Sequence, residues 1–408
     1  MSKTAKAFVY IQSGGPTAVI NTSFYGALTE AKKHPDVFSA LYGSRYGIEG
    51  LIEGNLIDLS KESYEDIELL KQTPGSVLGT TRKKLPSEIH DELYSKIIAN
   101  IRKFNIGYVF VNGGNDSMDT CNKLSKLCKE LDVDCQIIGV PKTVDNDLAD
   151  TDHSLGFPSA AKYVVNTIQS IAIDARSYRK SKVYIIEIMG RNAGWLTGAA
   201  DLLDEDTRPD FIYLPENKFD VDQFLKETKE VFDRKGYAIV AVSEGIKFDR
   251  PANKPVRYDN FGHAQLGGAA HDLAEIVEDK LDLPTRAIEF SLMQRSDPIL
   301  VSSIDQQEAV AVGRFAVKCA LRGLTGVMVG IKRQKPTNGH FTITLTANDT
   351  NAIANAETFI PKEMFGDKTR MGEPYREYLR PLIRGEVNCL FENGIVKRSK
   401  FKYIKVVK

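Results

Sequence analysis

Short runs of apolar, β-branched residues alternate with longer amphipathic stretches along the whole chain. Segments such as Ser117–Leu131 and Ala160–Ile173 have the apolar spacing of helices. Strands that alternate with helices in this way predict an α/β fold with mostly parallel sheets. The apolar runs that predict strands are Ala7–Ile11, Gly107–Val111, Gln136–Val140, Lys182–Ile188, Tyr237–Val242 and Val327–Ile331.

The length of the chain predicts two domains. With 408 residues, the chain is too long for one ordinary core and suits two domains that share a cleft. The stretch Lys247–Tyr258 contains Pro251 and Pro255 and predicts a flexible segment.

Charge and cysteine content exclude several classes of protein. Lys+Arg and Asp+Glu are both 54, so no overall positive field exists to hold nucleic acid or an anionic membrane. Any anion site must therefore be local. We find neither a membrane-spanning apolar run nor a signal-peptide pattern. The five cysteines are odd in number and form no CxxC pair, which favours free thiols in a reducing cytoplasm over a metal site.

Candidate chemistry lies in loops that directly follow predicted strands, where ligands bind in open parallel sheets. After the first strand comes the loop Gln12–Thr17 with Gly14 and Gly15, followed by a helical pattern. Glycines allow a phosphate to approach the backbone, and a helix N-terminus favours negative charge. A structural turn with Pro16 at the helix start explains this loop almost as well.

The loop Gly113–Ser117 is a stronger phosphate signal. Asn115, Asp116 and Ser117 follow two glycines at a strand end. A carboxylate beside phosphate-binding amides makes sense only if a cation or a selectivity role offsets the repulsion. A capped strand-to-helix turn, with Asp116 or Ser117 as N-cap, explains the same residues equally well.

The loop Lys142–Asp147 is the strongest local signal. Asp145 and Asp147 are two residues apart and point the same way in an extended chain. One carboxylate can deprotonate a hydroxyl while the other serves Mg²⁺, and Lys142 can hold a transferring phosphoryl group. An Asx-rich turn paired with Lys142 is the less favoured alternative, because a second phosphate-type loop precedes it.

Two further charged residues, an arginine and a carboxylate at strand ends, suit a phosphorylated sugar. Arg191 and Glu244 follow the strands Lys182–Ile188 and Tyr237–Val242, although a structural ion pair would use the same residue types. Arg82 is a candidate phosphate ligand, with a solvated basic loop that includes Lys83 and Lys84 as the alternative.

Taken in order, these motifs resemble the phosphofructokinase family. The similarity runs from Ser13-Gly14-Gly15 through Arg295. It implies two Rossmann-like α/β domains with mostly parallel sheets and an active site in the cleft between them. The expected donor-binding domain comprises 1–155 plus about 295–345. The expected sugar-phosphate-binding domain comprises 156–294 plus about 346–408.

Two departures from the ATP-using bacterial pattern point to the pyrophosphate-dependent branch. That pattern reads Gly-Gly-Asp-Gly-Ser where this chain has Asn115 and Asp116, and Pro-Gly-Thr-Ile-Asp-Asn-Asp where it has Lys142. Asp116 would lie where the α-phosphate of ATP needs room and would repel it. Lys142 would stabilise charge on pyrophosphate, which lacks a nucleoside as anchor.

The resemblance also implies roles for individual residues. Asp145 is similar to the base that takes the proton from the sugar 1-hydroxyl, and Lys142 and Asp116 join it as catalytic residues. Asn115 and Asp147 fall on positions associated with Mg²⁺, the implied cofactor. Positions for the donor are Gly14, Gly15, Arg82, Asn115 and Ser117. Positions for the sugar phosphate are Thr143, Lys182, Met189, Gly190, Arg191, Glu244, Arg286 and Arg295.

The function that the resemblance implies is reversible transfer of a phosphoryl group from pyrophosphate to the 1-hydroxyl of fructose 6-phosphate. The expected partners are these two substrates and further copies of the chain, as a homodimer or homotetramer, without nucleic acid or membrane. An ATP-dependent kinase of the same fold and a catalytically silent sugar-phosphate-binding subunit are the alternatives. Leu292, where ATP-using relatives have a histidine, leaves the sugar open, and sedoheptulose 7-phosphate is another candidate.

Overall fold

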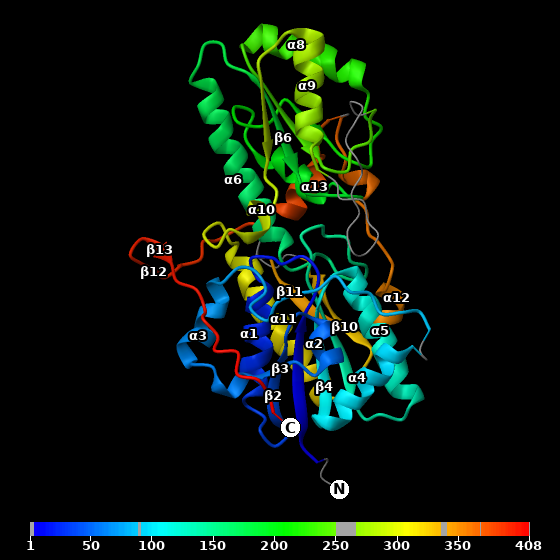
Figure 1. Ribbon diagram of the computed structural model, residues 1–408. Coiled ribbons are helices and arrows are strands. Elements are labelled where there is room, and N and C mark those ends of the chain that lie inside the picture. Colours follow the sequence, from blue (N-terminus) through cyan, green and yellow to red (C-terminus); the bar gives the residue numbers. More distant parts are fainter. Residues whose placement is uncertain (1–3, 89–90, 250–266, 336–340, 368, 408) are drawn as a thin grey trace.

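The computed structural model describes residues 4–88, 91–249, 267–335, 341–367 and 369–407. These residues form two α/β domains, each built on its own sheet and placed end to end (Figure 1). Residues 250–258 of the stretch that was predicted to be flexible lie outside the described residues. The prediction of an α/β fold with mostly parallel sheets is confirmed.

The large-sheet domain contains a seven-stranded sheet in the order β11-β10-β5-β4-β1-β2-β3. Five of its strands run parallel, while the edge strands β3 and β11 pair antiparallel to their neighbours. Its strands are β1 (Lys6–Gln12), β2 (Phe38–Ser44), β3 (Leu56–Asp58), β4 (Ile106–Gly113), β5 (Gln136–Pro141), β10 (Val327–Arg333) and β11 (Ile343–Asp349).

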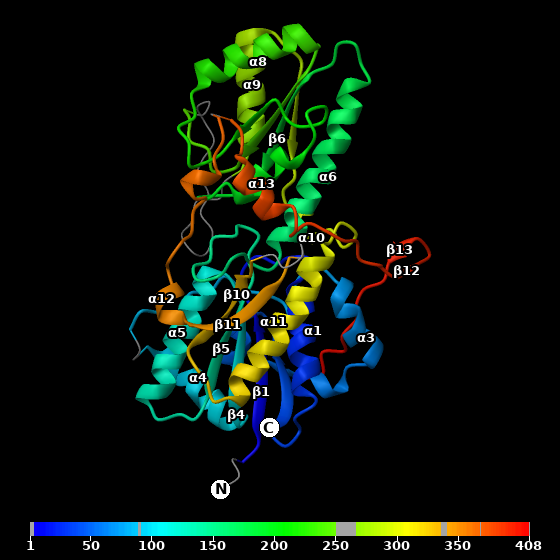
Figure 2. The ribbon, with the colours of Figure 1, turned by 180° about the vertical axis from the view of Figure 1, so that it is seen from behind.

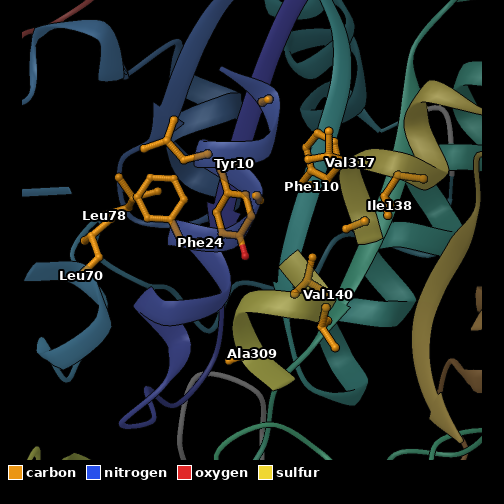
Figure 3. Packing of buried hydrophobic residues seen from close by; sticks show 14 of the residues in the cluster. Tyr10, Phe24, Leu70, Leu78, Phe110, Ile138, Val140, Ala309 and Val317 are labelled. Carbon is orange, nitrogen blue, oxygen red and sulfur yellow. The ribbon is translucent and has the colours of Figure 1, made fainter. Parts of the chain in front are cut away.

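Helices cover both faces of this sheet, as the continuous apolar runs of its central strands require. Alternate residues of β1 face opposite ways: Phe8 and Tyr10 pack toward α1 and α11, whereas Val9 packs toward α2, α4 and α5. Figure 3 shows the first of these cores, where the Tyr10 ring lies 4.7 Å from that of Phe24. The helices are α1 (Ile20–Ala31), α2 (Ile48–Glu53), α3 (Tyr64–Glu68), α4 (Glu92–Lys103), α5 (Asn115–Glu130), α11 (Ser303–Leu321) and α12 (Thr350–Ile353).

The small-sheet domain contains a four-stranded, fully parallel sheet in the order β7-β8-β6-β9. One face packs against α6, α7 and α13, and the other against α8 and α9. The strands are β6 (Val183–Ile188), β7 (Phe211–Tyr213), β8 (Ala238–Ser243) and β9 (Thr285–Glu289). The helices are α6 (Phe157–Arg176), α7 (Trp195–Gly198), α8 (Val221–Lys235), α9 (Ala269–Leu281), α10 (Met293–Ser296) and α13 (Glu373–Leu379).

All six predicted strands are present, as β1, β4, β5, β6, β8 and β10. The strands that the apolar pattern missed are β2, β3, β7, β9 and β11, together with the short hairpin of β12 (Phe391–Glu392) and β13 (Ile395–Val396). All of them except β2 lie at the edge of a sheet. An edge strand is covered less completely than a central one, so its sequence carries a weaker apolar signal.

The C-terminal tail corrects the predicted division of the chain. We expected residues from about 346 onward to belong to the sugar-phosphate domain. The part around α13 does pack on the small sheet, but α12 packs on α5, and the tail returns to the large sheet, where Ile57 forms a bridge with Lys405. Figures 1 and 2 show the red tail descending past α3 to the end of the large-sheet domain where the N-terminus also lies. Its anchors include backbone hydrogen bonds to β3 and the N–H groups of Lys402 and Tyr403, which donate to the Glu62 carboxylate.

Within the described part of the chain, no helix is both long and apolar enough to cross a membrane.

Candidate active site

A cavity of about 830 Å³ lies where the carboxyl ends of the central strands of the two sheets meet. The loops after β1, β4 and β5 line it from the large-sheet domain, and the loops after β6 and β8 from the small-sheet domain. The predicted site residues in its wall are Gly14, Gly15, Arg82, Asn115, Asp116, Ser117, Lys142, Thr143, Asp145, Asp147, Met189, Arg191, Glu244 and Arg295. The structure thus brings together residues that are up to 281 positions apart, from Gly14 to Arg295.

Lys142 occupies the centre of the large-sheet side. Its side chain is buried, and its ammonium donates a 2.6 Å hydrogen bond to the carbonyl oxygen of Gly15. Burial, together with the positive charge of Arg295, lowers the pKa of Lys142 to about 7, although Asp145 opposes this shift. Arg82 contributes further repulsion. Three cationic side chains close enough to affect one another form a site suited to a multiply charged anion.

Gly15 is a position that only glycine fits without rearrangement. A Cβ atom placed there would lie 2.5 Å from a guanidinium nitrogen of Arg295, so the arginine lies directly against this backbone. The loop is also tied to the segment around Arg82, because the Gly14 N–H donates to the carbonyl oxygen of Thr81 and the Thr80 hydroxyl donates to that of Gly14. Arg295 therefore lies over the phosphate-type loop of the large-sheet domain, although its own helix, α10, belongs to the other domain.

The carboxylate loop is held in shape by Asn146, which lies between Asp145 and Asp147. Asn146 has a left-handed backbone (φ 56°), a conformation that asparagine tolerates better than most residues. Its amide donates to the Tyr378 hydroxyl (2.9 Å) and its carbonyl oxygen accepts from the Ser154 N–H (2.9 Å). These contacts fix the direction in which both neighbouring carboxylates point.

The two carboxylates sit in an environment that disfavours their charge. Burial raises the pKa of Asp145, against the opposing effect of Thr143, whose hydroxyl lies 3.3 Å from its Oδ2 atom. Burial, followed by repulsion from Asp145 and Glu357, raises the pKa of Asp147 to about 7. A base with a pKa above the usual carboxyl range is well matched to proton transfer near neutral pH.

Glu244 faces these residues from the end of β8. Its Oε1 atom accepts a 3.4 Å hydrogen bond from the Gly190 N–H. Burial and the negative charge of Asp145 raise the pKa of Glu244 to about 7. Gly190 contributes this backbone contact, and Met189 and Arg191 on either side of it reach the cavity wall.

Asp116 lies in the first turn of α5 and forms an ion pair with Lys84, whose ammonium is 2.9 Å from its Oδ1 atom. Lys84 also lines the cavity. The sequence placed this lysine in a solvated basic loop, so its role as the partner of Asp116 was missed. The side chains of Lys84 and Asp116 keep access to solvent (44% and 31% exposed), so the pair lies at a solvent-accessible part of the cavity.

Two predicted sugar-phosphate residues lie outside the cavity of their own chain. Lys182 precedes the first residue of β6, and Arg286 is the second residue of the edge strand β9. The cavity lies at the other, carboxyl ends of these parallel strands. Neither residue therefore joins Arg295 within one chain.

Sequence reasoning missed a second group of wall residues, Asn192, Asn355 and Glu357. Asn192 donates to the carboxylate of Glu357 at 3.1 and 3.2 Å. Asn355 and Glu357 lie between α12 and the C-terminal part of the small-sheet domain, in a segment with no periodic pattern and no glycine-rich motif. No sequence signal identified them.

Oxygen ligands for a divalent cation are available, but no group of three or more His, Cys, Asp or Glu side chains suited to a metal occurs among the described residues. Asp147 is the carboxylate best placed, given the negative charge of Asp145 and Glu357 around it. Mg²⁺ is commonly bound through one or two carboxylates together with substrate phosphates, so a sparse protein site is compatible with it.

The arrangement as a whole suits transfer of a small anionic group to a hydroxyl. Cationic side chains gather at the large-sheet loops, a carboxylate with a raised pKa follows Lys142 by three residues, and a charged pair restricts one end. No glycine-rich G-x-G-x-x-G turn opens α1, where a dinucleotide site would need one.

Comparison with known proteins identifies similar chains. The family model described as phosphofructokinase matches residues 7–320. The chain is 38% identical to the pyrophosphate–fructose 6-phosphate 1-phosphotransferase of Methylococcus capsulatus, over 96% of this chain and 94% of that protein. It is 34% identical to a sulfofructose kinase of Alkalicoccus urumqiensis, over 80% and 84% of the two chains. The crystal structure of a pyrophosphate-dependent phosphofructokinase from Marinobacter aquaeolei superimposes with a TM-score of 0.89 at 35% identity, covering 99% of this chain and 98% of that one.

Proposed function

The chain belongs to the phosphofructokinase family, and we propose that it transfers a phosphoryl group reversibly from pyrophosphate to the 1-hydroxyl of fructose 6-phosphate. The products are fructose 1,6-bisphosphate and phosphate. The observation that carries the proposal is the position of Lys142, which is buried against Gly15 and followed three residues later by Asp145. A cation for the transferring group and a base for the acceptor hydroxyl thus occupy one short loop.

In this proposal, the residues act as follows. The Asp145 carboxylate takes the proton of the sugar 1-hydroxyl as that oxygen forms a bond to the terminal phosphorus of pyrophosphate. The bridging P–O bond breaks, and its electron pair leaves with phosphate. Lys142 and Arg82 stabilise the charge on the transferring and leaving groups, which is the main contribution a protein makes to such a transfer.

Mg²⁺ fits the site as the cofactor. Carboxylate oxygens are its preferred ligands, and Asp147 stands where Asp145 and Glu357 concentrate negative charge. Asp147 would hold the ion, and the carbonyl oxygen of Asn115 is a second candidate ligand. When bound, the ion neutralises charge on the phosphates of the donor.

The sugar is held from the small-sheet domain. Met189, Gly190 and Arg191 follow β6, Glu244 follows β8, and Thr143 approaches from the carboxylate loop. Glu244 accepts hydrogen bonds, which suits the hydroxyls of a sugar. The similar sulfofructose kinase shows why the acceptor needs a direct test. Fructose 6-phosphate, sedoheptulose 7-phosphate and sulfofructose should each be offered with pyrophosphate and Mg²⁺, and products followed by ³¹P NMR. We expect fructose 1,6-bisphosphate and phosphate in equal amounts; turnover of only one of the other two sugars would replace the proposed substrate.

We also propose that the sugar-phosphate site is shared between two copies of the chain, in a homodimer or homotetramer. Arg286 lies exposed on the edge strand β9, away from the cavity of its own chain, and Lys182 directly precedes the neighbouring strand β6. Exposed apolar side chains, Ile173 and Tyr178 near the end of α6, lie in the same domain and are candidates for burial by a partner. The partner's Arg286 would then complete the 6-phosphate site beside Arg295.

A mixing experiment tests this shared site. Asp145→Asn and Arg286→Ala should each be nearly inactive alone, because one lacks the base and the other lacks a phosphate ligand. After the two proteins are unfolded and refolded together, activity should return to about one quarter of wild type, since half of the dimers are mixed and one of their two sites is intact. A monomer in sedimentation analysis, or no recovery on mixing despite proven mixed dimers, would contradict the proposal.

The lowered pKa of Lys142 predicts that donor binding is linked to protons. Above pH 7 the free ammonium loses its proton, whereas a bound polyanion favours the charged form. Pyrophosphate binding at pH 8 should therefore take up protons, and its affinity should fall as the pH rises above 7. Calorimetry in buffers of different ionisation enthalpy measures this uptake. Lys142→Gly should reduce it, and equal uptake by both proteins would assign the protons to pyrophosphate alone.

We propose the cytoplasm as the location, supported by five cysteines that are all free thiols.

A further inference from the structure

A short segment, residues 355–358, connects the two domains along the wall of the cavity. We call it the strap. In Figure 1 it belongs to the orange chain that leaves α12 and rises to the small-sheet domain. The Asn192 amide donates to Glu357, and the Trp195 indole N–H donates to the carbonyl oxygen of Thr358. These two contacts attach the strap to the loop after β6 and to the start of α7, on the sugar side.

On the donor side, the strap is attached chiefly through Asn115. The side-chain oxygen of Asn115 (Oδ1) accepts a 2.8 Å hydrogen bond from the backbone N–H of Asn355. The side-chain nitrogen of Asn115 (Nδ2) donates a 2.6 Å hydrogen bond to the backbone carbonyl oxygen of Ala356. The N–H of Thr358 donates to the carbonyl oxygen of Asp147 at 2.8 Å. One side chain thus satisfies two successive backbone groups of the strap.

The side-chain chemistry explains why an amide stands at this position. A primary amide both donates and accepts, whereas an ionised carboxylate only accepts. An aspartate at 115, as in the ATP-using pattern, would still accept from Asn355 but would face the Ala356 carbonyl oxygen with a second acceptor. The side-chain nitrogen that distinguishes Asn115 from the aspartate of the ATP-using pattern is therefore the atom that donates to the strap.

The strap itself brings functional groups to the cavity. Asn355 and Glu357 both line it, and Glu357 lies close enough to Asp147 to raise the pKa of that carboxyl. Asn355 has a left-handed backbone (φ 63°), which requires support from its surroundings. Support comes from Asn115 and from Asp119, whose Oδ1 atom lies 3.4 Å from the Asn355 amide nitrogen.

We propose that Asn115 is a positioning residue, which seats the strap through paired hydrogen bonds and so couples the donor loop to the sugar loop across the cavity. This inference rests on the proposed function for its effect on catalysis, but the seating of the strap does not. A role as ligand to Mg²⁺ is the alternative for the same side chain, and the two roles make opposite demands on an aspartate.

The test compares Asn115→Asp with Asn115→Ala. If Asn115 seats the strap, both variants should lower kcat by about tenfold or more, because the aspartate cannot donate to Ala356. Their affinity for Mn²⁺ alone, measured by electron paramagnetic resonance, should stay at the wild-type value. If Asn115 is instead a metal ligand, Asn115→Asp should keep activity and bind Mn²⁺ as well or better, while Asn115→Ala should lose both.

Hydrogen–deuterium exchange provides a readout that needs no substrate. Peptides that cover the strap should exchange faster in both variants than in wild type, because the Asn355 N–H loses its protection or its fixed geometry. Asn122→Asp is the matched control, since it makes the same chemical change two turns along α5 at a side chain that contacts Asn351 rather than the strap. Unchanged strap exchange in Asn115→Asp and Asn115→Ala would overturn the inference. Faster exchange without any turnover by wild type would instead leave the inference standing and refute the proposed reaction.

Discussion

Replacement of Asp145 by asparagine should lower kcat by about 10²–10⁴-fold, the usual effect of removing a positioned general base. Asparagine keeps the shape of the side chain and can still contact the Thr143 hydroxyl, so the loop should remain folded. What is lost is the ability to accept a proton. The effect should appear in steady-state kinetics as a fall in kcat with little change in the KM for pyrophosphate.

The dependence of wild-type activity on pH should also show that Asp145 acts as a base. Burial raises the pKa of Asp145, and a base must be deprotonated to act. Activity should therefore decline, as the pH is lowered, at a higher pH than for an ordinary carboxyl group. Asp150→Asn is a suitable control, because Asp150 is an exposed carboxylate, outside the cavity, five residues along the chain. Near-wild-type turnover by Asp145→Asn would exclude it as the base.

Replacement of Lys142 by glycine should reduce pyrophosphate turnover by about 10²–10³-fold, the typical cost of removing one group that stabilises transition-state charge. The ammonium is buried and held by Gly15, so its charge is little screened by solvent. The kcat with pyrophosphate should fall by this factor, while the melting temperature should change little. A variant that keeps wild-type kcat with pyrophosphate would remove Lys142 from the mechanism.

Asp116→Gly should weaken the exclusion of ATP from the donor site. At an assumed separation of about 4 Å and an effective dielectric of about 20, two like charges repel by roughly 4 kcal/mol. That figure is an upper limit here, because Lys84 lies 2.9 Å from the carboxylate and solvent reaches the pair. Relief of this repulsion should admit some ATP, and the double variant with Lys142→Gly should resemble an ATP-using enzyme more than either single one. An Asp116→Gly variant with unchanged donor preference would contradict this account of selectivity.

The sequence was most informative where chemistry and strand ends coincide. Asp145, Lys142 and Glu244 could be selected as candidates because polar residues that directly follow a buried strand must gather at one edge of a parallel sheet. The same reasoning placed Gly15 and Arg191 correctly in the cavity wall. These residues combine an unusual local composition with a position that topology determines.

Other parts of the site depend on contacts that no local pattern records. The strap is held at the cavity by hydrogen bonds from its own backbone to the Asn115 side chain and to the backbone of Asp147. Its residues show neither an apolar period nor a motif. Lys84 lies in a segment with the composition of a surface loop. Only its ion pair with Asp116 in the structure shows that it belongs to the site. Arg286 matched the family pattern, yet it lies at the amino end of its strand, which a one-dimensional pattern cannot distinguish from the carboxyl end.

A comparison of two donors shows whether pyrophosphate is the phosphoryl donor. Purified protein, fructose 6-phosphate and Mg²⁺ are combined with either pyrophosphate or ATP, and formation of fructose 1,6-bisphosphate is followed over a range of donor concentrations. We predict that kcat/KM is at least 10²-fold higher for pyrophosphate, as expected when one donor must face the repulsion of Asp116 and the other need not. Efficient turnover with ATP and none with pyrophosphate would show that the chain is an ATP-dependent kinase.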